Sequence, residues 1–398
     1  MLSSVIVGAI GLGLCVSQSI AFFILLSRLL KGARRRPPLS PRPSTPEMLG
    51  TVSVVVPTLN EVERIAPCLE GLSRQGYEVR EILIVDSNSR DGTREKVKDA
   101  AERDPRIRLK TDDPLPADWV GRPWALHNGF LFSSPESEWI LGIDADTRPE
   151  PGLVAGIVTA AIEEGYDLVT LSPRFILSYP GEWWFQPALL MTLLYRFDSA
   201  GVREQPPERV MANGQCFLCR RSVLEALGGY SVAKGSFCDD VTLARSIATK
   251  GYRVGFLDGA NLIRVRMYEG LRETWTEWGR SIDLKDASYQ SQLGGDLALL
   301  LLTQGLPIIV APLLAIALVF GYDFPTVKIA LGLNLLLIFI RFALLFAVSP
   351  SYDRSESSFL ASRFFWLSPL ADPLAVTRIF LSAFTRPKRW RGRVYGDG

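Results

Sequence analysis

Four carboxylates in this sequence have the type and spacing to bind a metal ion together with a phosphorylated ligand. Each follows a short, strongly apolar stretch; the four are Glu61, Asp86, Asp144 and Asp146. Several carboxylates at one place repel one another unless a cation lies among them. Oxygen ligands are those that Mg²⁺ or Mn²⁺ prefers when the ion also holds a diphosphate. A pair such as Asp144 and Asp146 is weak evidence by itself, because a solvated strand end has the same pattern.

The elements that must position these carboxylates alternate between strands and helices. The expected strands are 52–56, 81–85, 139–143 and 168–171, and the expected helices are 61–72, 91–101 and 151–163. Asn60 is placed to cap the helix 61–72. Alternation of this kind predicts an α/β domain with a mostly parallel sheet covered on both faces. Because ligands bind at the carboxyl ends of such strands, the four carboxylates should converge on one edge.

Composition excludes several other classes of protein. The chain has 398 residues, 47% of them hydrophobic and 22% charged, which excludes collagenous, low-complexity and globally disordered chains. A net charge of +2 provides no basic field for nucleic acid, so no nucleic-acid partner is expected. Five cysteines are no disulfide framework, and one histidine excludes the His-rich zinc enzymes. A metal would therefore have to bind to carboxylates.

Uncharged segments at both ends predict membrane helices. Residues 5–26 carry no charge and would form a helix of about 33 Å, which matches the hydrocarbon core of a bilayer. Basic residues follow this segment at 28–36, which predicts an uncleaved anchor with its C-terminal end in the cytoplasm. Segments 297–322 and 329–348 predict two more spans, the second interrupted by Arg341. A buried core helix is the alternative for the first segment.

The remaining segments complete the expected domain organisation. Residues 359–384 are apolar but contain charges and prolines, so we expect interfacial or re-entrant helices there. Three spans place the basic tail 386–393 on the cytoplasmic side, as the positive-inside rule requires. The expected domains are an anchor at 1–30, a Pro/Arg-rich extended linker at 31–50, a cytosolic catalytic domain at 51–288, two spans within 297–348, and interfacial helices with the tail at 349–398.

Three spaced motifs resemble a known enzyme family. SVVVPTLNE at 53–61, IVDSNSRDGT at 84–93 and DAD at 144–146 are similar to the motifs of family 2 glycosyltransferases of the GT-A fold. The resemblance implies a nucleotide-sugar donor, a divalent metal, and inversion at the anomeric carbon. It implies a metal at Asp146 and Asp144. The nucleotide-sugar residues that it implies are Pro57, Thr58, Asn60, Glu61, Asp86, Ser89, Arg122 and Asp144.

Arg122 belongs to a more specific segment. WVGRPWA at 119–125 is similar to W-x-G-K-x-x-A segments in the membrane-bound branch that glycosylates lipids, including the ceramide, hopanoid and carotenoid enzymes. A cation on a glycine-adjacent loop can neutralise a diphosphate, and Arg does so with a planar fork. A surface Arg beside a buried Trp is the alternative.

The resemblance also implies a catalytic base and an acceptor side. Asp240, in CDDVTLA at 238–244, occupies the place of the family's proton acceptor, and Asp239 replaces the usual Glu. A favourable charge at a helix N-terminus is the alternative. The acceptor-side residues are Gly214, Gln215, Trp275, Trp278 and Arg280. Glu277 stands where the family's Q/R-x-x-R-W element has Arg, which argues against a ceramide or a processive polysaccharide enzyme.

Three further features of the sequence can be explained by packing or surface position without a role in catalysis. Cys216 and Cys219 on a strand point to opposite faces, so we expect core residues rather than a metal or redox site. His127 is expected to pack or lie at the surface rather than act in catalysis. The aromatic stretch 182–187 is either core or a helix at the membrane interface.

Together, the residues and the resemblance predict an inverting glycosyltransferase with a lipid acceptor. The expected donor is a UDP-sugar, and the preferred acceptor is a hydroxylated carotenoid. The alternatives are a ceramide, sterol or hopanoid glycosyltransferase, then a processive polysaccharide synthase, then a non-catalytic lipid-binding scaffold. We expect an integral protein of a bacterial plasma or thylakoid membrane, with the catalytic domain facing the cytoplasm.

Overall fold

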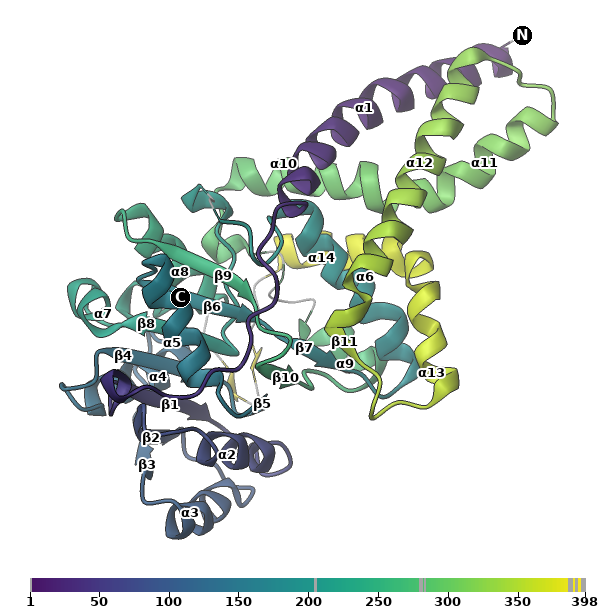
Figure 1. Cartoon of the computed structure of the whole chain (residues 1–398). Coiled ribbons are helices and arrows are strands. Elements are labelled where there is room, and N and C mark those ends of the chain that lie inside the picture. The colour runs from purple at the N-terminus through teal and green to yellow at the C-terminus, as the bar shows by residue number, and fades with distance from the viewer. Residues whose placement is uncertain are drawn as a thin grey trace. The chain divides into compact units, whose positions relative to one another are not determined.

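The computed structural model describes residues 2–203, 206–278, 282, 284–385, 389–390 and 393–394, and it divides into two compact units (Figure 1). The sheet unit comprises Arg35–Ile176, Ala200–Met267 and Pro387–Gly398. The helical unit comprises Met1–Arg34, Leu177–Ser199 and Tyr268–Arg386. This division differs from the continuous domain expected at 51–288, because residues 177–199 and those after 267 pack with the apolar helices.

The sheet unit is built on one seven-stranded sheet. Its strands are β1 (Val52–Thr58), β2 (Val79–Asp86), β3 (Ile107–Thr111), β4 (Trp139–Ile143), β6 (Leu168–Ser172), β8 (Cys216–Arg220) and β9 (Val254–Asp258). Their order is β3-β2-β1-β4-β8-β6-β9. All neighbours pair in parallel except β8, which is antiparallel to both β4 and β6. The predicted mostly parallel α/β sheet is therefore confirmed.

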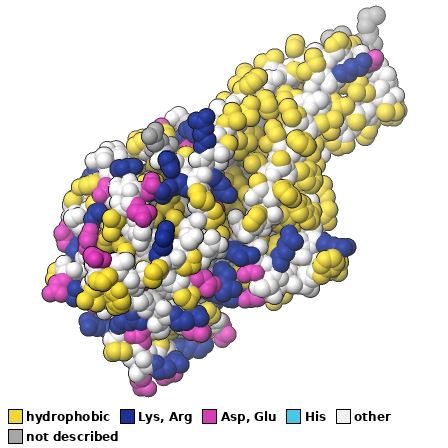
Figure 2. Space-filling model, in the orientation of Figure 1, with side chains coloured by type: hydrophobic (Ala, Val, Ile, Leu, Met, Phe, Trp, Pro, Cys, Tyr) yellow, Lys and Arg dark blue, Asp and Glu magenta, His cyan; other side chains and the backbone are white. Residues whose placement is uncertain are grey.

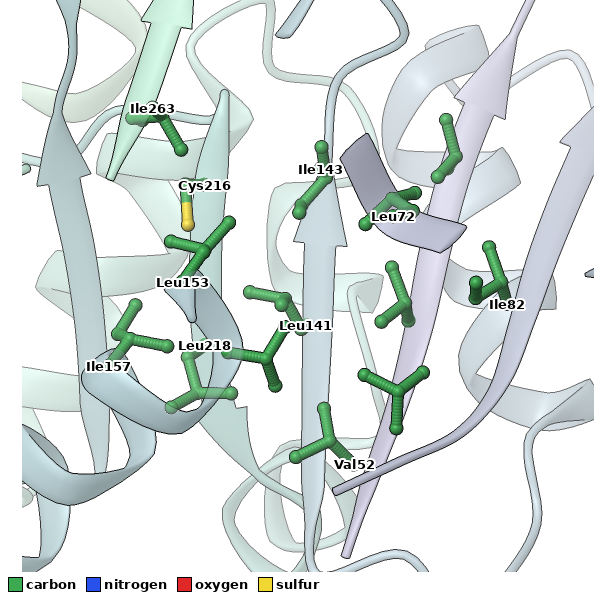
Figure 3. Packing of buried hydrophobic residues seen from close by; sticks show 14 of the residues in the cluster. Val52, Leu72, Ile82, Leu141, Ile143, Leu153, Ile157, Cys216, Leu218 and Ile263 are labelled. Atoms are coloured by element: carbon green, nitrogen blue, oxygen red, sulfur yellow. The ribbon is translucent and has the colours of Figure 1, made fainter. Parts of the chain in front are cut away.

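Helices cover both faces of this sheet because its central strands are apolar on both sides. The helices are α2 (Ile65–Ser73), α3 (Thr93–Arg103), α4 (Gly121–Phe132), α5 (Leu153–Glu164), α7 (Arg221–Leu227) and α8 (Asp239–Thr249). On one face, α2 and α5 pack Leu72, Leu153 and Ile157 against Val52 and Leu141, as Figure 3 shows.

The other face of β1 receives α4 at unusually close range. A Cβ atom at Gly129 would lie 2.1 Å from Cγ1 of Val55, so only glycine lets this helix approach the strand so closely. This contact fixes the helix whose first turn carries Arg122.

Smaller elements complete the sheet unit. Strand β10 (Ile263–Val265) pairs antiparallel with β5 (Thr147–Pro149) and parallel with β7 (Arg174–Ile176). The proline-rich linker is extended, as predicted, but it is also bonded to the unit along its length. Backbone N–H groups of Arg36, Leu39 and Arg42 donate to the carbonyls of Gly201, Asp258 and Gly152, at N···O distances of 2.9, 2.8 and 3.2 Å.

The helical unit contains the apolar helices of the chain. They are α1 (Leu2–Gly32), α6 (Pro180–Arg196), α9 (Gly270–Thr276), α10 (Gln290–Leu300), α11 (Pro307–Val319), α12 (Pro325–Val348), α13 (Phe359–Arg363) and α14 (Asp372–Phe384). Among the described residues, three stretches are long and apolar enough to cross a membrane: Ile6–Gly32, Pro325–Ser351 and Phe359–Phe384. The bent pair Gln290–Gly305 and Pro307–Val319 would be a fourth if it forms one span. Figure 2 shows the outer face of these helices covered largely by hydrophobic side chains.

Two of the expected membrane segments differ in detail from the sequence prediction. The segment expected at 297–322 is not one straight helix: Gln290–Gly305 and Pro307–Val319 meet at 51°. A π-helical turn at Leu301–Gly305 followed by Pro307 explains the bend. Phe359–Phe384 is long and apolar enough to span, but it contains a 3₁₀ stretch at Phe364–Ala371. Its expected interfacial placement stays a prediction, and most of the basic tail lies outside the described residues.

Polar side chains tie the helical unit together inside apolar surroundings. The amides of Gln18 and Asn334 donate to each other's oxygen at 2.9 and 2.8 Å. Arg341 forms a two-point ion pair with Asp372, with Nε–Oδ2 at 2.8 Å and Nη2–Oδ1 at 3.1 Å, and both side chains are buried. The amide of Gln304 donates to the same carboxylate at 3.0 Å. Arg341 therefore faces protein.

The aromatic stretch 182–187 lies in α6, in the core of the helical unit. Trp183, Phe185 and Leu189 are fully buried there. Phe185 stacks on Trp275, with ring centroids 5.7 Å apart. Of the two explanations that the sequence left open, the structure supports packing in the core.

The Arg341–Asp372 pair yields a prediction about stability. Arg341→Met leaves the carboxylate of Asp372 buried without its partner, which should lower the free energy of unfolding by about 3–5 kcal/mol. The double variant Arg341→Met/Asp372→Leu should recover much of this loss, because no buried charge remains. Unfolding of the detergent-solubilised chain measures all three proteins.

Lys328→Met in the same helix is the matched control. Its ion pair with Asp323, at 2.6 Å, is exposed, so the expected loss is at most about 1 kcal/mol. A double variant no more stable than Arg341→Met would contradict the interpretation of the pair.

Candidate active site

A cleft with a cavity volume of about 50 Å³ opens at the carboxyl ends of β1, β2 and β4. The polar side chains at its wall come from the loops that follow these strands and from the first turn of α4. The lining residues are Pro57, Thr58, Leu59, Glu61, Ser87, Gly121, Arg122, Ala125, Asp144 and Ala145. The structure thus brings together five of the predicted nucleotide-sugar residues. The other five lining residues were not predicted as site residues, although all lie within the motifs quoted above: Leu59, Ser87, Gly121, Ala125 and Ala145.

One side of the cleft is formed where β1 and β2 end together. Thr58 pairs in register with Asp86, and its hydroxyl lies 3.3 Å from the carbonyl of Val85 and 3.4 Å from Oδ1 of Asp86. Oδ2 of Asp86 accepts the N–H of Ser89 at 3.0 Å. Asp86 is fully buried. This carboxylate therefore shapes the loop that follows β2.

The turn after β1 corrects one prediction from the sequence. Asn60 does not cap α2, which begins at Ile65 with Arg64 as its N-cap residue. Instead Asn60 adopts φ 55°, and its side-chain oxygen accepts the N–H of Arg90 at 3.0 Å, while its own N–H donates to Ser89 Oγ at 2.8 Å. Asparagine tolerates this left-handed conformation, so the residue locks two loops together rather than starting a helix.

Arg122 crosses the floor of the site and contacts three of its parts. Nε donates to Oδ1 of Asp144 at 2.9 Å, Nη1 to Oδ2 of Asp239, and Nη2 to the carbonyl of Gly214 at 2.7 Å. Burial by itself would lower the pKa of Arg122, but the negative charges of Asp144 and Asp239 raise it, so the guanidinium stays charged.

Asp239 and Asp240 occupy the first turn of α8, where their charges interact favourably with the helix dipole. Oδ2 of Asp240 accepts the N–H of Gly214 at 2.7 Å, and Oδ1 accepts the N–H of Val241 at 2.9 Å. Burial raises the pKa of Asp239 to about 7 although Arg122 lowers it. Burial likewise raises the pKa of Asp240, again against Arg122. Both groups are thus more basic than an ordinary aspartate.

The segment before β8 is a turn fixed from both sides. The N–H of Asn213 donates to Thr170 Oγ1 at 2.8 Å, and the same hydroxyl donates to the carbonyl of Asn213 at 2.7 Å. The carbonyl of Gln215 accepts from Thr147 Oγ1 at 3.2 Å. The Gln215 side chain bonds to Nδ2 of Asn213 at 3.1 Å, so it is engaged within the turn.

Asp144 and Asp146 are the residues that could hold a divalent cation. Within the described part of the chain, no three Asp, Glu, His or Cys side chains form a metal-binding group. Two carboxylates nevertheless suit Mg²⁺ or Mn²⁺, since such ions often take their remaining ligands from phosphates and water. Burial and then the negative charge of Asp144 raise the pKa of Asp146 to about 7, so a cation there would stabilise the ionised pair.

The remaining predicted acceptor-side residues are Trp275, Trp278 and Arg280. Trp275 and Trp278 belong to the helical unit, where Trp278 is buried and stacks on Tyr268 at 6.4 Å. Arg280 lies outside the described residues. The acceptor role of all three stays a prediction.

The structure gives the two remaining sequence features a packing role. His127 stacks on Trp124, with ring centroids 5.9 Å apart, and its Nδ1 accepts the N–H of Tyr230 at 3.3 Å. Cys216 and Cys219 are free and fully buried.

Comparison with known proteins agrees with this geometry. Residues 53–228 match the model of the family described as Glycosyl transferase family 2. Residues 53–228 are therefore similar to a family 2 glycosyltransferase domain. It is 23% identical over 248 residues to the 4,4'-diaponeurosporenoate glycosyltransferase of Staphylococcus haemolyticus, covering 62% of this chain and 65% of the relative. It is 28% identical over 246 residues to the probable glycosyltransferase YdaM of Bacillus subtilis, covering 58% and 53%.

A solved structure shows the same fold over most of the chain. The mannosyltransferase PcManGT of Pyrobaculum calidifontis, in complex with GDP-Man and Mn²⁺, superposes with a TM-score of 0.52 and 18% identity. The superposition covers 94% of this chain and 98% of that one. The chain spans less than two thirds of the length of the two curated relatives, so their activities bear on it only as a proposal.

The charge arrangement yields a prediction about stability and pH. Arg122→Met should lower the free energy of unfolding more at about pH 8 than at about pH 5.5. Without the guanidinium, the folded-state pKa of Asp239 rises further above its unfolded value of about 3.9, so the folded state binds more protons. The free energy of unfolding then falls as pH rises from the unfolded-state pKa of Asp239 to its folded-state pKa. Unfolding of both proteins at the two pH values measures the difference, and an equal loss at both would contradict it.

Proposed function

We propose that this chain transfers a sugar, with inversion, from a nucleotide-sugar donor to a hydroxyl group of a membrane lipid. The observation that carries the proposal is the position of Arg122, which bonds at once to Asp144 at the end of β4 and to Asp239 at the start of α8. The guanidinium of Arg122 thus lies between two pairs of carboxylates. Asp144 and Asp146 suit a metal ion with a diphosphate, and Asp239 and Asp240 suit proton transfer. The family 2 domain match supports this assignment.

The donor binds in the cleft at the ends of β1, β2 and β4. Thr58, Glu61 and Asp86, with Pro57, Asn60 and Ser89 shaping the loops, hold the nucleoside part. Arg122 and Asp144 lie at the diphosphate end. UDP is the preferred nucleotide, and this choice depends on the family resemblance alone.

Asp146 and Asp144 would hold a Mg²⁺ or Mn²⁺ ion. When bound, the ion neutralises charge that develops on the departing diphosphate. Arg122 adds a second positive charge that is already oriented, because its Nη1 and Nη2 are fixed by Asp239 and Gly214.

Asp240 accepts the proton of the acceptor hydroxyl. The hydroxyl oxygen forms a bond to the anomeric carbon as the bond from that carbon to the diphosphate oxygen breaks, and the electron pair leaves with the nucleoside diphosphate. The raised pKa of Asp240 suits this role, since a base is most effective when its pKa approaches the working pH. Asp239 supports the step by holding Arg122.

The acceptor is a lipid hydroxyl, and a hydroxylated carotenoid is the preferred one. Support comes from the apolar helical unit with its candidate spans and from the relative that is named for a carotenoid acid. Ceramide, sterol and hopanoid acceptors are the alternatives. Gly214, Gln215, Trp275, Trp278 and Arg280 are proposed to serve the acceptor side, and the catalytic domain is proposed to face the cytoplasm of a bacterial membrane.

The direct test compares wild type with Asp240→Asn. Lipids extracted from cells with and without the chain should differ, by mass spectrometry, by a lipid carrying one added hexose. Asp240→Asn keeps the side-chain size but removes the basicity, so kcat should fall by about 10²–10⁴-fold while donor affinity changes little. No new glycolipid in cells with the wild-type chain would refute the proposal.

Asp239→Asn is the matched neighbour. Its loss of kcat should be smaller, because Asp239 acts through Arg122. If Asp239→Asn abolished turnover and Asp240→Asn did not, the base would be Asp239.

Metal dependence is tested separately. Chelator should abolish transfer, and added Mg²⁺ or Mn²⁺ should restore it, because the carboxylates of Asp144 and Asp146 cannot neutralise a diphosphate. Asp146→Ala should also lose metal-dependent binding of UDP, as measured by titration calorimetry. Full transfer in excess chelator would argue that Arg122 alone stabilises the leaving group.

A further inference from the structure

The backbone of Gly214 links Arg122 to Asp240. Its N–H donates to Oδ2 of Asp240 at 2.7 Å, and its carbonyl accepts from Nη2 of Arg122 at 2.7 Å. A single residue therefore contacts the cation of the diphosphate end and the carboxylate of the proton-transfer end through its two backbone groups.

This peptide cannot shift easily, because the residues on either side are anchored to the sheet. Thr170 of β6 both donates to and accepts from the backbone of Asn213, at 2.7 and 2.8 Å. Thr147 of β5 holds the carbonyl of Gln215 at 3.2 Å. Within the turn, the N–H of Gln215 donates to Oδ1 of Asn213 at 3.0 Å. The backbone of Gly214 is thus held in place between the side chains of Arg122 and Asp240.

Only glycine fits at this point. A Cβ atom at position 214 would lie 2.3 Å from Nη2 and 2.8 Å from Cζ of Arg122. The guanidinium has little room to retreat, since Nε and Nη1 are bonded to Asp144 and Asp239 and the side chain is only 12% exposed. A methyl group would therefore break at least one of the three Arg122 contacts.

We propose that Gly214 is a positioning residue of the transfer reaction. Its backbone N–H and carbonyl fix Arg122, the cation at the leaving diphosphate, relative to Asp240, the carboxylate that takes the acceptor proton. The inference rests on the proposed function and deepens it, because it adds a role in alignment to the place of Gly214 on the acceptor side. Misplacement of a reacting group by about 1 Å can cost on the order of 10²-fold in rate.

Gly214→Ala should also change the pH dependence of the reaction. The charged groups that face Asp240 are Arg122 from α4, Asp239 from α8 and Asp144 at the end of β4. Displacing Arg122 weakens the positive charge near Asp240 while both negative charges remain. The acidic limb of the kcat/KM profile should therefore move to higher pH, which a purely structural defect would not cause.

A double-mutant cycle tests the coupling without depending on activity. Gly214→Ala should lower the unfolding midpoint of the detergent-solubilised full chain in the wild-type background. In the Arg122→Ala background it should have little effect, because the clashing guanidinium is gone. Equal losses in both backgrounds would overturn the inference. Gly235→Ala, at a position with nothing within 4 Å of the added Cβ, is the control and should change neither.

The kinetic test uses UDP-glucose and vesicles of bacterial lipid that contain a hydroxylated carotenoid. Gly214→Ala should lower kcat by about 10–100-fold and move the acidic limb upward, while Gly235→Ala behaves as wild type. If the wild-type chain glycosylates the lipid and Gly214→Ala has the same kcat and the same pH profile, the inference is overturned. A wild-type chain without transfer would count against the proposed substrates, and the double-mutant cycle would still decide the coupling.

Discussion

The site depends on one buried positive charge among several negative ones. Arg122 bonds to Asp144, Asp239 and the carbonyl of Gly214, and removing it would leave carboxylates close together in a poorly solvated place. Such groups repel and resist ionisation unless a cation lies among them. In the proposed function, a bound diphosphate would share the guanidinium of Arg122, and a metal ion would balance the negative charges of Asp144 and Asp146.

The sheet makes this arrangement possible. Three parallel neighbours, β2, β1 and β4, end at one edge, so their following loops meet there. The antiparallel β8 starts at that same edge, which brings the turn 213–215 beside the carboxylates. Arg122 occupies the first turn of α4, where the helix dipole disfavours a cation. The bonds to Asp144 and Asp239 offset that cost.

The helical unit also contains paired polar side chains in its interior. Its surface is apolar, and two pairs of its interior polar side chains bond to each other: Gln18 with Asn334, and Arg341 with Asp372. In apolar surroundings such pairs specify which helices pack together, because an unpaired partner would be costly. The helix α1 is therefore bonded into this unit by Gln18, and is more than a tether for the catalytic domain.

Sequence by itself determined the strands that end at the cleft and the carboxylates that follow them, since continuous apolar runs such as 52–56 and 139–143 are local signals of buried parallel strands. It also determined the apolar character of both chain ends. Only the tertiary structure decided that Asn60 locks two loops instead of capping α2, that residues 180–196 pack in the helical unit, and that the Gly214 peptide joins Arg122 to Asp240. These features depend on contacts between residues that are 26 or more positions apart in the chain. Packing and pairing set the free energy of such contacts, and no local pattern of residues records them.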